Sequence, residues 1–230
     1  MTPSIENTKR KRAATDPIEK VNQKSDDHFI REHLCPSDSS WTSWTHPVTG
    51  VQYTLALIGA ERLTSDDLDA CYNFIEETSR ADYEASTMGW KPAKKRAEIE
   101  SPELRYIVVK DEEGVVRGFT SLMPTYEEGE PVIYCYEIHL MPELQRTGLA
   151  RLLMSFLEDV ASHTPPVNKV MLTCFLSNQR ALNFYRSLGF TKDPISPEPK
   201  KLRYGREFIP DYVIMSKNVE SKVTLGLDSL

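Results

Sequence analysis

Hydrophobic and polar positions follow regular spacings from about residue 51 onwards. Residues 51–58 predict a strand, and Leu68 and Ile75 then lie on one face of a helix behind Thr64, a residue type that caps helices. We expect this helix to run toward Tyr83–Trp90, where Met88-Gly89 interrupts it. Further on, the sequence predicts a short helix from Pro92 and a hairpin with strands at 105–110 and 115–123.

The most strand-like segment covers residues 131–140. Tyr134 and Tyr136 alternate there with Cys135 and Glu137. Glu137 should therefore point away from the two tyrosines unless a bulge intervenes. A bulge would bring one tyrosine beside Glu137 and leave the other in the core.

Helices and strands alternate after this segment. A helix from about Gly148 carries apolar residues at successive spacings of 3, 1, 3, 1 and 3, which is typical of a core-facing stripe. Pro165 and Pro166 prevent its continuation. A strand at 169–175, a helix at 178–188 and a last strand near 212–215 are then predicted. This order indicates an α/β fold with a mixed sheet.

Length and composition suit one domain with extensions, since the chain has 230 residues, 40% hydrophobic and 27% charged. No apolar run reaches membrane-spanning length, and residues 1–12 lack the apolar centre of a signal peptide, so we expect no membrane association. The four cysteines are scattered, with no CxxC pair and no clustered histidines. This predicts a reducing, intracellular compartment, no disulfide framework and no metal site.

Charge is distributed unevenly along the chain. Residues 1–25 contain six Lys or Arg and three Asp or Glu, although the net charge of the whole chain is −6. The acidic remainder argues against direct nucleic-acid binding and suits a basic substrate. Lys9–Arg12 fits both a disordered tail and a nuclear-import signal, and we expect a protein of the nucleus and cytoplasm. The expected organisation is a basic, disordered segment at 1–25, an arm packing on the domain at 26–50, the domain at 51–217 and a tail at 218–230.

The segment Gln145–Ala150 connects the strand at 131–140 to the next helix. The first N–H groups of that helix lack partners within it and lie at the positive end of its dipole, which favours a phosphate. Gly148 and Ala150 are small enough for a pyrophosphate to approach the backbone, and Arg146 can add charge-assisted hydrogen bonds. Taken alone, the turn is better explained as an ordinary strand-to-helix connection, because Q-x-x-G-x-A is a loose pattern.

The surrounding order of elements favours the phosphate site. A strand precedes the Q-x-x-G-x-A turn, an amphipathic helix follows it, and the run Asn178…Ala181…Phe184-Tyr185…Gly189-Phe190 comes at a suitable distance. This combination resembles the GNAT superfamily of N-acetyltransferases over roughly residues 51–217. The resemblance implies the GNAT fold: a mixed, mostly antiparallel twisted sheet flanked by helices, here behind an N-terminal extension. It also implies acetyl-CoA as co-substrate and no metal.

A narrower resemblance is to the NatD-type N-terminal acetyltransferases, which modify the N-termini of histone H4 and histone 2A. It rests on Tyr83-Glu84, Met88-Gly89-Trp90-Lys91, Tyr134-Cys135-Tyr136-Glu137 and Lys169–Thr173. It implies a monomer that transfers acetyl directly to the N-terminal serine amine of these histone tails. Met88 stands where an additional tryptophan can occur and Thr125 where an aspartate can, so the wall of the peptide pocket departs from that pattern.

Roles for individual residues follow from the resemblance. Coenzyme binding would involve Ile138, His139, Leu140, Gln145, Arg146, Thr147, Gly148, Leu149, Ala150 and Asn178. The peptide would contact Tyr83, Trp90, Glu127, Glu128, Tyr134, Tyr136, Thr173 and Tyr212. Catalysis is assigned to Glu137, Tyr136 and Tyr185.

Elementary chemistry is compatible with these roles. An α-amino group has a pKa of about 7.7–8.0 and a lysine one near 10.4, so a carboxylate acting through water suffices as base for a chain end. Glu137 could instead face solvent or pair with a lysine. Tyr185 stands where many GNAT enzymes have a tyrosine acid for the thiolate, and simple helix packing is its alternative. For Asn178 the alternative is a helix cap, and backbone N–H groups near residues 137–139 would hold the oxyanion.

Two other functions stay open. A GNAT enzyme acting on a lysine side chain or a small amine would need a stronger base and an open groove. We expect the loop from Pro194 to Pro210 to close one side of that groove, which favours a chain end. A non-catalytic module that binds coenzyme or peptide in the same fold is the other alternative.

Overall fold

The computed structural model describes residues 16–34, 39–201, 203 and 207–222. The basic cluster Lys9–Arg12, Cys35 and the last eight residues of the expected tail lie outside this part of the chain. Within it, no helix is both long enough and apolar enough to cross a membrane.

The helical segments are α1 (Pro17–Asn22), α2 (Asp26–Phe29), the π-helix η1 (Ile30–Leu34), α3 (Ser65–Ala85), α4 (Pro92–Ile99), α5 (Leu149–Ser162), α6 (Gln179–Ser187) and the short 3₁₀ turns η2 (Ser39–Thr42), η3 (Ala60–Arg62) and η4 (Pro142–Leu144). The strands are β1 (Ser43–Thr45), β2 (Gln52–Gly59), β3 (Arg105–Lys110), β4 (Val116–Glu127), β5 (Glu130–Leu140), β6 (Lys169–Phe175), β7 (Thr191–Lys192), β8 (Lys200–Lys201), β9 (Glu207–Phe208) and β10 (Tyr212–Asn218). Those predicted from residue 51 onwards are confirmed to within a few residues.

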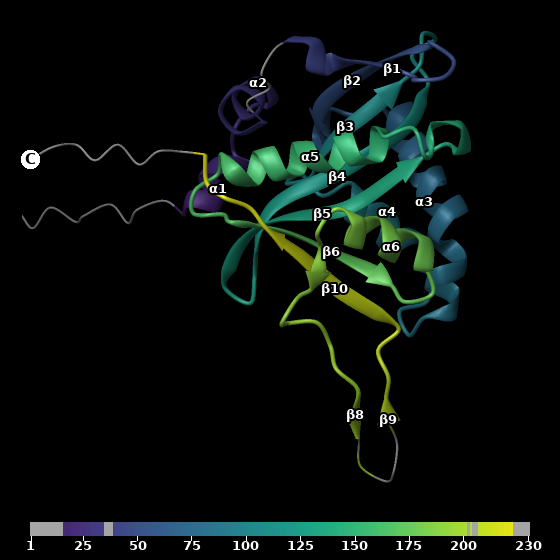
Figure 1. Cartoon of the computed structure of the whole chain (residues 1–230), viewed down its shortest axis with the longest axis vertical. Coiled ribbons are helices and arrows are strands. Elements are labelled where there is room, and N and C mark those ends of the chain that lie inside the picture. The colour runs from purple at the N-terminus through teal and green to yellow at the C-terminus, as the bar shows by residue number, and fades with distance from the viewer. Residues whose placement is uncertain (1–15, 35–38, 202, 204–206, 223–230) are drawn as a thin grey trace, which may run out of the picture.

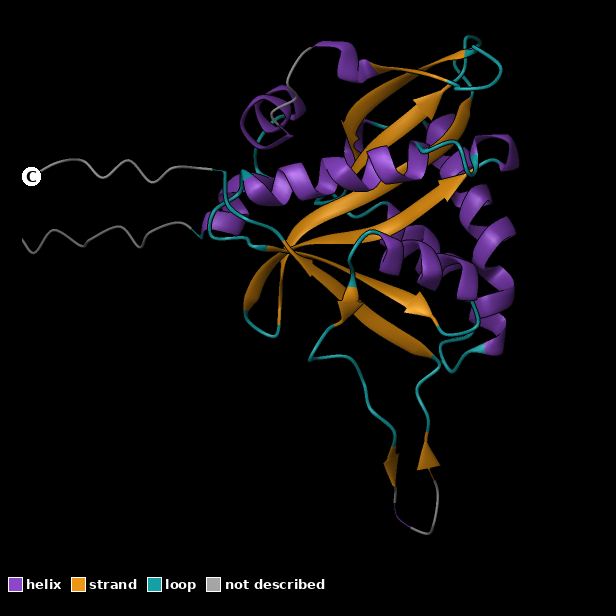
Figure 2. Ribbon diagram, viewed as in Figure 1, coloured by secondary structure: helices purple, strands orange, loops and turns teal. Residues whose placement is uncertain are grey.

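One large sheet runs through the molecule in the order β1-β2-β3-β4-β5-β6-β10-β7. Its strand pairs are antiparallel except for the parallel pair β5–β6. Helix α5 lies across one face, with α6 on the same side, and α3 and α4 cover the other (Figures 1 and 2). The predicted mixed, mostly antiparallel sheet flanked by helices is therefore confirmed.

Two hydrophobic layers hold this arrangement together. On one face, Leu153 and Leu157 of α5 pack on the inward residues of the central strands, such as Leu122. On the other, Phe74 and Ile75 of α3 pack on Tyr106 and Phe119. Successive strand residues point to opposite faces, so both layers draw on the same strands.

The sheet splits between β5 and β6. These strands pair only where Ile133–Cys135 lies opposite Val170–Leu172, and beyond Cys135 they diverge (Figure 2). The edge of β5 from Tyr136 to Leu140 pairs with none of the described strands on that side. The divergence of β5 and β6 leaves a gap in the middle of the sheet.

Residues 16–34 of the N-terminal extension are folded, which corrects the expectation of disorder throughout residues 1–25. Asp16 caps α1 through a hydrogen bond of 2.8 Å from the Ile18 N–H, and Pro17 opens the helix. Ile18 and Val21 are buried in the α5-side core. These two apolar residues, three positions apart, place one face of a short helix against the domain.

The arm at residues 26–50 packs on the same side. Phe29 is fully buried, and the Trp41 ring meets the Phe156 ring of α5 with centroids 5.8 Å apart. Strand β1 adds to the sheet by pairing Trp44 with Tyr53.

Candidate active site

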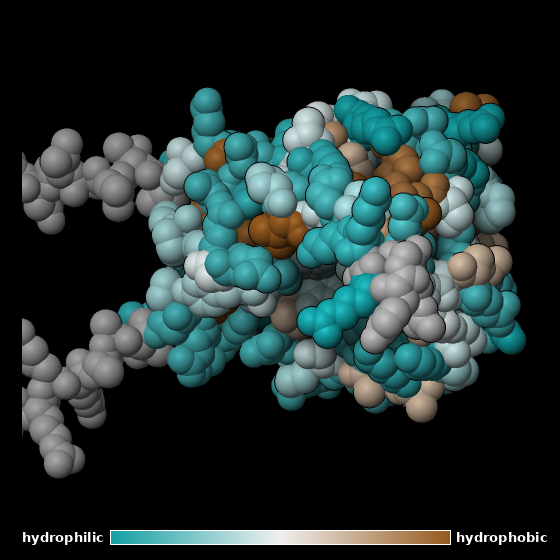
Figure 3. Space-filling model, turned by 90° about the horizontal axis from the view of Figure 1, so that it is seen from below, coloured by the Kyte–Doolittle hydropathy of each residue, from teal (hydrophilic) through white to brown (hydrophobic). Residues whose placement is uncertain are grey.

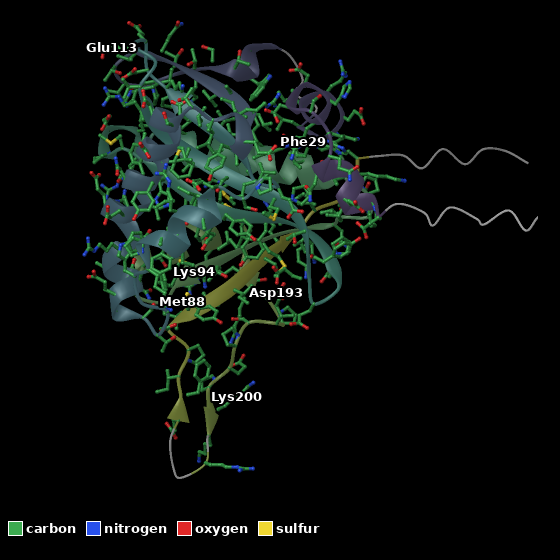
Figure 4. All side chains as sticks on the ribbon, turned by 180° about the vertical axis from the view of Figure 1, so that it is seen from behind. Phe29, Met88, Lys94, Glu113, Asp193 and Lys200 are labelled. Atoms are coloured by element: carbon green, nitrogen blue, oxygen red, sulfur yellow. The ribbon has the colours of Figure 1, made fainter. Side chains whose placement is uncertain are left out.

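A cavity of about 1140 Å³ opens where β5 and β6 diverge. It is lined by α3, the α3–α4 connection and α4 on one side, and by the starts of α5 and α6 on the other. Met88 and Lys94, which line it, lie toward the end of the molecule from which the hairpin with Lys200 projects (Figure 4). The face seen from the hairpin end is mostly hydrophilic, with scattered apolar areas (Figure 3).

The cavity brings together most of the residues that the sequence singled out. On its wall are Tyr83, Trp90, Glu127, Tyr134, Tyr136, Glu137, Ile138, His139, Leu140, Gln145, Arg146, Gly148, Ala150, Thr173, Asn178 and Tyr185. Four predicted residues are not on that wall: Glu128, Thr147, Leu149 and Tyr212.

A β-bulge shapes the strand at the centre of the cavity. Ser121 of β4 lies opposite Glu137, but its neighbour Leu122 lies opposite Cys135, so Tyr136 is an extra residue in β5. Tyr136 packs with the α3-side core, and Glu137 bonds Lys95 of α4. The bulge that the sequence pattern allowed is therefore present. It turns the side chains of Tyr136 and Glu137 to the same face of the sheet, the one covered by α3 and α4.

Buried side chains support the bulge from behind. The Thr120 hydroxyl, fully buried, donates a hydrogen bond of 2.9 Å to the Glu137 carbonyl. The Cys135 thiol lies 3.8 Å from the same carbonyl and is itself buried, which raises the pKa of Cys135 to about 12. A thiol with that pKa is a poor nucleophile at neutral pH, so Cys135 serves as packing.

The Glu137 carboxylate is held at both oxygens. Its Oε1 lies 3.2 Å from the Lys95 Nζ and its Oε2 lies 2.7 Å from the His139 Nε2. The Glu137 side chain is 11% exposed and that of Lys95 only 5%. Lys95 also donates to the Tyr83 hydroxyl at 2.7 Å and to Glu98 at 2.8 Å. The sequence analysis allowed Glu137 to pair with a lysine. That ion pair, between Glu137 and Lys95, is present in the wall of the cavity.

Both members of this ion pair are charged at neutral pH. Burial alone would raise the pKa of Glu137, but the hydrogen bond and charge of His139 and the charge of Lys95 hold it below its usual value. Burial alone would lower the pKa of Lys95, but the interactions with Glu137, Tyr83 and Glu98 together outweigh it and raise that pKa. The cavity thus contains an ionised carboxylate with both oxygens engaged.

Sequence reasoning missed Lys95, and it assigned His139 to coenzyme binding only. Lys95 precedes the buried Ile99 by four residues on α4, so both project from one face into the molecule. This four-residue spacing is the sequence signal that could have placed Lys95 on the buried face of α4. His139 is held by Thr78 of α3, whose hydroxyl lies 2.7 Å from its Nδ1, and this contact between distant elements left no local pattern.

Tyr185 of α6 lies at the cavity wall with 8% of its surface exposed. Its ring packs against Phe184 and Phe190, with centroids 5.4 and 6.0 Å away. Its hydroxyl makes no hydrogen bond to any described residue. Burial raises the pKa of Tyr185 well above its usual value, so the hydroxyl keeps its proton at neutral pH and is a weaker acid than an exposed tyrosine.

The turn before α5 has the backbone shape of an anion site. Arg146 and Gly148 have φ angles of 64° and 92°, and left-handed residues of this kind turn successive N–H groups toward one concavity. The N–H groups of Gly148, Ala150 and Arg151 donate to no acceptor among the described residues. Arg151 and Arg180, not singled out from the sequence, add two cations to the same wall.

The turn residues off the wall support it instead. The Thr147 hydroxyl donates to the Leu144 carbonyl at 2.6 Å, and Leu149 is fully buried in the core. Gln145 bridges the turn to β5 through a 2.9 Å hydrogen bond from its Nε2 to the Leu140 carbonyl. Asn178 caps α6 by accepting from the Ala181 N–H at 3.0 Å while also facing the cavity.

Aromatic and acidic residues form the other end of the cavity. The Tyr83 ring packs edge-on against Trp90 and Phe175, at 5.5 and 4.8 Å between centroids. The Tyr134 hydroxyl lies 2.6 Å from the Thr173 hydroxyl across the β5–β6 divide. Burial and the charge of Glu128 raise the pKa of Glu127, the acidic residue of the β4–β5 hairpin that reaches the wall.

The described residues of the loop from Pro194 to Pro210 do not close the cavity, which corrects that expectation. None of its described residues is on the wall. Strands β8 and β9 pair with each other and project beyond the sheet as a separate hairpin (Figure 1). Trp90 and Glu98, beside and on α4, do line the cavity.

No group of three or more His, Cys, Asp or Glu side chains among the described residues is arranged to hold a metal ion. The described cysteines, Cys71, Cys135 and Cys174, are buried free thiols.

The fold, the split sheet and the N–H-rich turn define an acyltransferase scaffold, and comparison with known families agrees. The model of the acetyltransferase (GNAT) family matches residues 68–190, which is more than half of the chain. The chain belongs to the GNAT family of acetyltransferases.

Among individual proteins, the chain is similar to N-alpha-acetyltransferase 40 of Saccharomyces cerevisiae. The two are 35% identical over 156 residues, covering 57% of this chain and 54% of the yeast protein. The chain thus matches about half the length of this relative.

Solved structures share the fold at low sequence identity. Arabidopsis thaliana NAA60 in complex with acetyl-CoA is 12% identical, covering 72% of this chain and 99% of that chain, with a TM-score of 0.51. A GNAT-family acetyltransferase from Staphylococcus aureus is 9% identical, covering 73% and 100%, with a TM-score of 0.52.

Proposed function

We propose that this chain transfers acetyl from acetyl-CoA directly to the N-terminal α-amine of a protein, with the serine that begins histone H4 and histone 2A as acceptor. The observation that carries the proposal is the ionised Glu137 in a cavity with an N–H-rich turn at one end and aromatic and acidic residues at the other. Similarity to a yeast N-alpha-acetyltransferase supports the choice of a chain end.

The residues of the turn fit the coenzyme. Free N–H groups at the start of α5, together with Arg146, Arg151 and Arg180, suit the phosphates of acetyl-CoA. Asn178 is on the cavity wall and would orient the pantetheine arm. Acetyl-CoA supplies the thioester on which the transfer acts.

Glu137 is suited to accept a proton through water from an amine that is already largely neutral. Its lowered pKa keeps it ionised at neutral pH but also makes it a weak base. An α-amine, with a pKa of about 7.7–8.0, is partly neutral at physiological pH, whereas a lysine at about 10.4 is not. The strength of this base therefore favours a chain end.

The remaining steps fall to groups beside Glu137. The uncovered edge of β5 after Cys135 offers backbone N–H groups for a developing oxyanion. Tyr185 keeps its proton and has its hydroxyl unpaired among the described residues, so it would protonate the leaving thiolate.

The acceptor peptide would lie at the aromatic end. Tyr83, Trp90, Tyr134 and Tyr136 provide flat walls for a small N-terminal residue, as expected for Ser-Gly. Glu127 carries the negative charge nearest the hairpin tip on this wall and would pair with the arginine that follows in Ser-Gly-Arg.

Incubation with acetyl-CoA and a Ser-Gly-Arg-Gly-Lys peptide tests the proposal, beside the same peptide with a blocked N-terminus. We expect product from the free peptide only. Acetylation of the blocked peptide at lysine would overturn the chain-end assignment. No product from either peptide, with coenzyme bound tightly, would instead indicate a binding module.

A further inference from the structure

His139 connects the carboxylate of Glu137 to a hydroxyl on α3. Its Nε2 lies 2.7 Å from the Glu137 Oε2, and its Nδ1 lies 2.7 Å from the Thr78 Oγ1. The ring packs on the Phe119 ring of β4, with centroids 5.4 Å apart, and the His139 side chain is 9% exposed. Glu137, His139 and Thr78 all line the cavity. An imidazole held at both nitrogens and on its face has a fixed orientation.

The hydrogen-bond partners decide where the protons of this ring lie. An ionised carboxylate only accepts hydrogen bonds, so the Nε2 that faces Glu137 carries a proton. The Thr78 hydroxyl has a single proton and two acceptors in reach, the Phe74 carbonyl at 2.7 Å and the His139 Nδ1 at 2.7 Å. When it donates to Nδ1, the ring is neutral. When it donates to Phe74, its oxygen accepts from a protonated Nδ1, and the ring is charged.

Rotation of the Thr78 hydroxyl therefore lets His139 gain or lose a proton while every heavy atom stays in place. In both forms each ring nitrogen has a partner, so neither form carries the cost of an unpaired buried polar group. In both forms Glu137 also keeps its donor at Oε2. Thr78 is exposed on α3, so the Nδ1 proton can exchange with solvent through its hydroxyl.

The neighbouring groups keep their charge near neutral pH. The titratable groups that face Glu137 and His139 are Tyr83 of α3, Lys95 and Glu98 of α4, Tyr106 of β3, Cys135 and Tyr136 of β5, and Tyr185 of α6. Burial raises the pKa of each tyrosine and of the thiol, so these are neutral, and the pKa of Lys95 is raised, so it is charged. Two carboxylates, Glu137 and Glu98, thus surround one ammonium. Imidazole is the side chain whose charge changes most readily near neutral pH, so protonation of His139 alters this balance.

We propose that His139 is a positioning residue that also sets the strength of Glu137 as a base. It holds the carboxylate through Nε2, and its charge makes Glu137 a weaker base when the ring is protonated and a stronger one when the ring is neutral. The inference rests on the proposed function, in which Glu137 accepts a proton from the acceptor amine. The charge of His139 is one of the causes that lower the pKa of Glu137, and a neutral ring removes that cause.

His139→Gln separates the charge of the ring from its hydrogen bonds. The glutamine amide can donate to Glu137 and its carbonyl can accept from Thr78, but this side chain does not titrate. The quantity to measure is kcat/KM of the variant divided by kcat/KM of the wild type, on the Ser-Gly-Arg-Gly-Lys peptide with saturating acetyl-CoA. Titration of the acceptor amine cancels in this ratio. We expect the ratio to be at least about threefold higher near pH 6 than near pH 9, because the ring becomes charged in the wild type and glutamine does not.

His33→Gln is the matched control. His33 is also a buried histidine with a threonine hydroxyl beside its Nδ1, that of Thr164 at 3.0 Å, but it is not on the cavity wall. Its ratio to wild type should be the same near pH 6 and near pH 9. A ratio for His139→Gln that is equally flat, within about 1.5-fold, would overturn the inference, since a purely structural histidine gives that result.

His139→Leu tests the positioning role, because leucine neither donates to Glu137 nor accepts from Thr78. Near pH 9 we expect its kcat to be about tenfold or more below that of His139→Gln, with similar affinity for coenzyme A by calorimetry. Equal kcat values in the two variants would show that His139 does not position Glu137.

The wild-type protein provides a test that does not depend on a variant. NMR of protein with isotope-labelled histidine identifies the protonated nitrogen of each ring, and His139 is assigned through its contact with the Phe119 ring. We expect the neutral His139 ring to carry its proton on Nε2, with Nδ1 bare. A neutral ring with its proton on Nδ1 would overturn the inference. A wild type that acetylates only lysine side chains would instead overturn the proposed function and leave this result unaffected.

Discussion

Replacement of Thr120 by valine tests whether the β-bulge positions Glu137. The Thr120 hydroxyl is fully buried and donates a hydrogen bond of 2.9 Å to the Glu137 carbonyl, on the strand that carries the extra residue Tyr136. Valine has nearly the same shape, so the change removes the hydrogen bond without leaving a cavity. The bulge then loses a contact that fixes its backbone.

The expected size of the effect follows from this contact. Loss of this buried hydrogen bond leaves the Glu137 carbonyl with the weaker contact from the Cys135 thiol, and costs about 1–3 kcal/mol of unfolding free energy. Displacement of Glu137 should lower kcat between about tenfold and a hundredfold, because catalytic groups misplaced by about 1 Å lose that much.

Thr120→Ser separates the two effects. Serine keeps the hydroxyl but loses a buried methyl, which costs about 1 kcal/mol. Urea unfolding should therefore show both variants to be destabilised, while kcat falls strongly only in Thr120→Val. If Thr120→Val were destabilised but had the kcat of Thr120→Ser, the bulge would not position Glu137 and the reasoning would be refuted.

Three further predictions follow from other parts of the molecule. Glu137→Gln should lower kcat by roughly a hundredfold or more while the affinity for coenzyme stays nearly unchanged. Steady-state kinetics measures the first and calorimetry the second. A near-normal rate would show that Glu137 is not the base. Phe29→Ala should cost about 3–5 kcal/mol in urea unfolding because Phe29 is fully buried under the Arg105 guanidinium, and a loss below about 1 kcal/mol would show that the arm is not part of the cooperative core. Asp193→Asn should be less stable than wild type at neutral pH. Burial alone would raise the pKa of Asp193, but hydrogen bonds from Ser216, the Ile195 N–H and Lys169 hold it below the usual 3.8. The ionised Asp193 therefore stabilises the fold above pH 3.8, and this stabilisation is lost as the pH falls through the lower pKa of the folded state. A stability difference that persists unchanged well below that pH would contradict this assignment.

Local patterns in the sequence were enough for most of the fold. The alternation in β5 and the helical stripe of α5 depend only on neighbouring residues and on which face is buried, so both elements were predicted to within a few residues. Helix α1 was missed because its six residues, with Ile18 and Val21 as the buried pair, are too few for a clear period within a charged segment.

The site was predictable in its residue types but not in its contacts. The turn at Gln145–Ala150 and the carboxylate Glu137 stand in a short stretch of chain, so their grouping could be inferred. The engagement of both Glu137 oxygens depends on Lys95, which is 42 residues away on α4, and on His139, held in place by Thr78 of α3. Only the folded sheet brings these elements together, and the bulge at Tyr136 has no signature in the alternation itself.

The claim that acetyl is delivered to a chain end is tested most directly on one peptide that contains both kinds of amine. Ser-Gly-Arg-Gly-Lys is incubated with the wild-type protein and acetyl-CoA, and tandem mass spectrometry locates the acetyl group in the first product formed. We predict that the acetyl group is on the serine α-amine. Acetyl on the lysine side chain, with the serine amine unmodified, would contradict it.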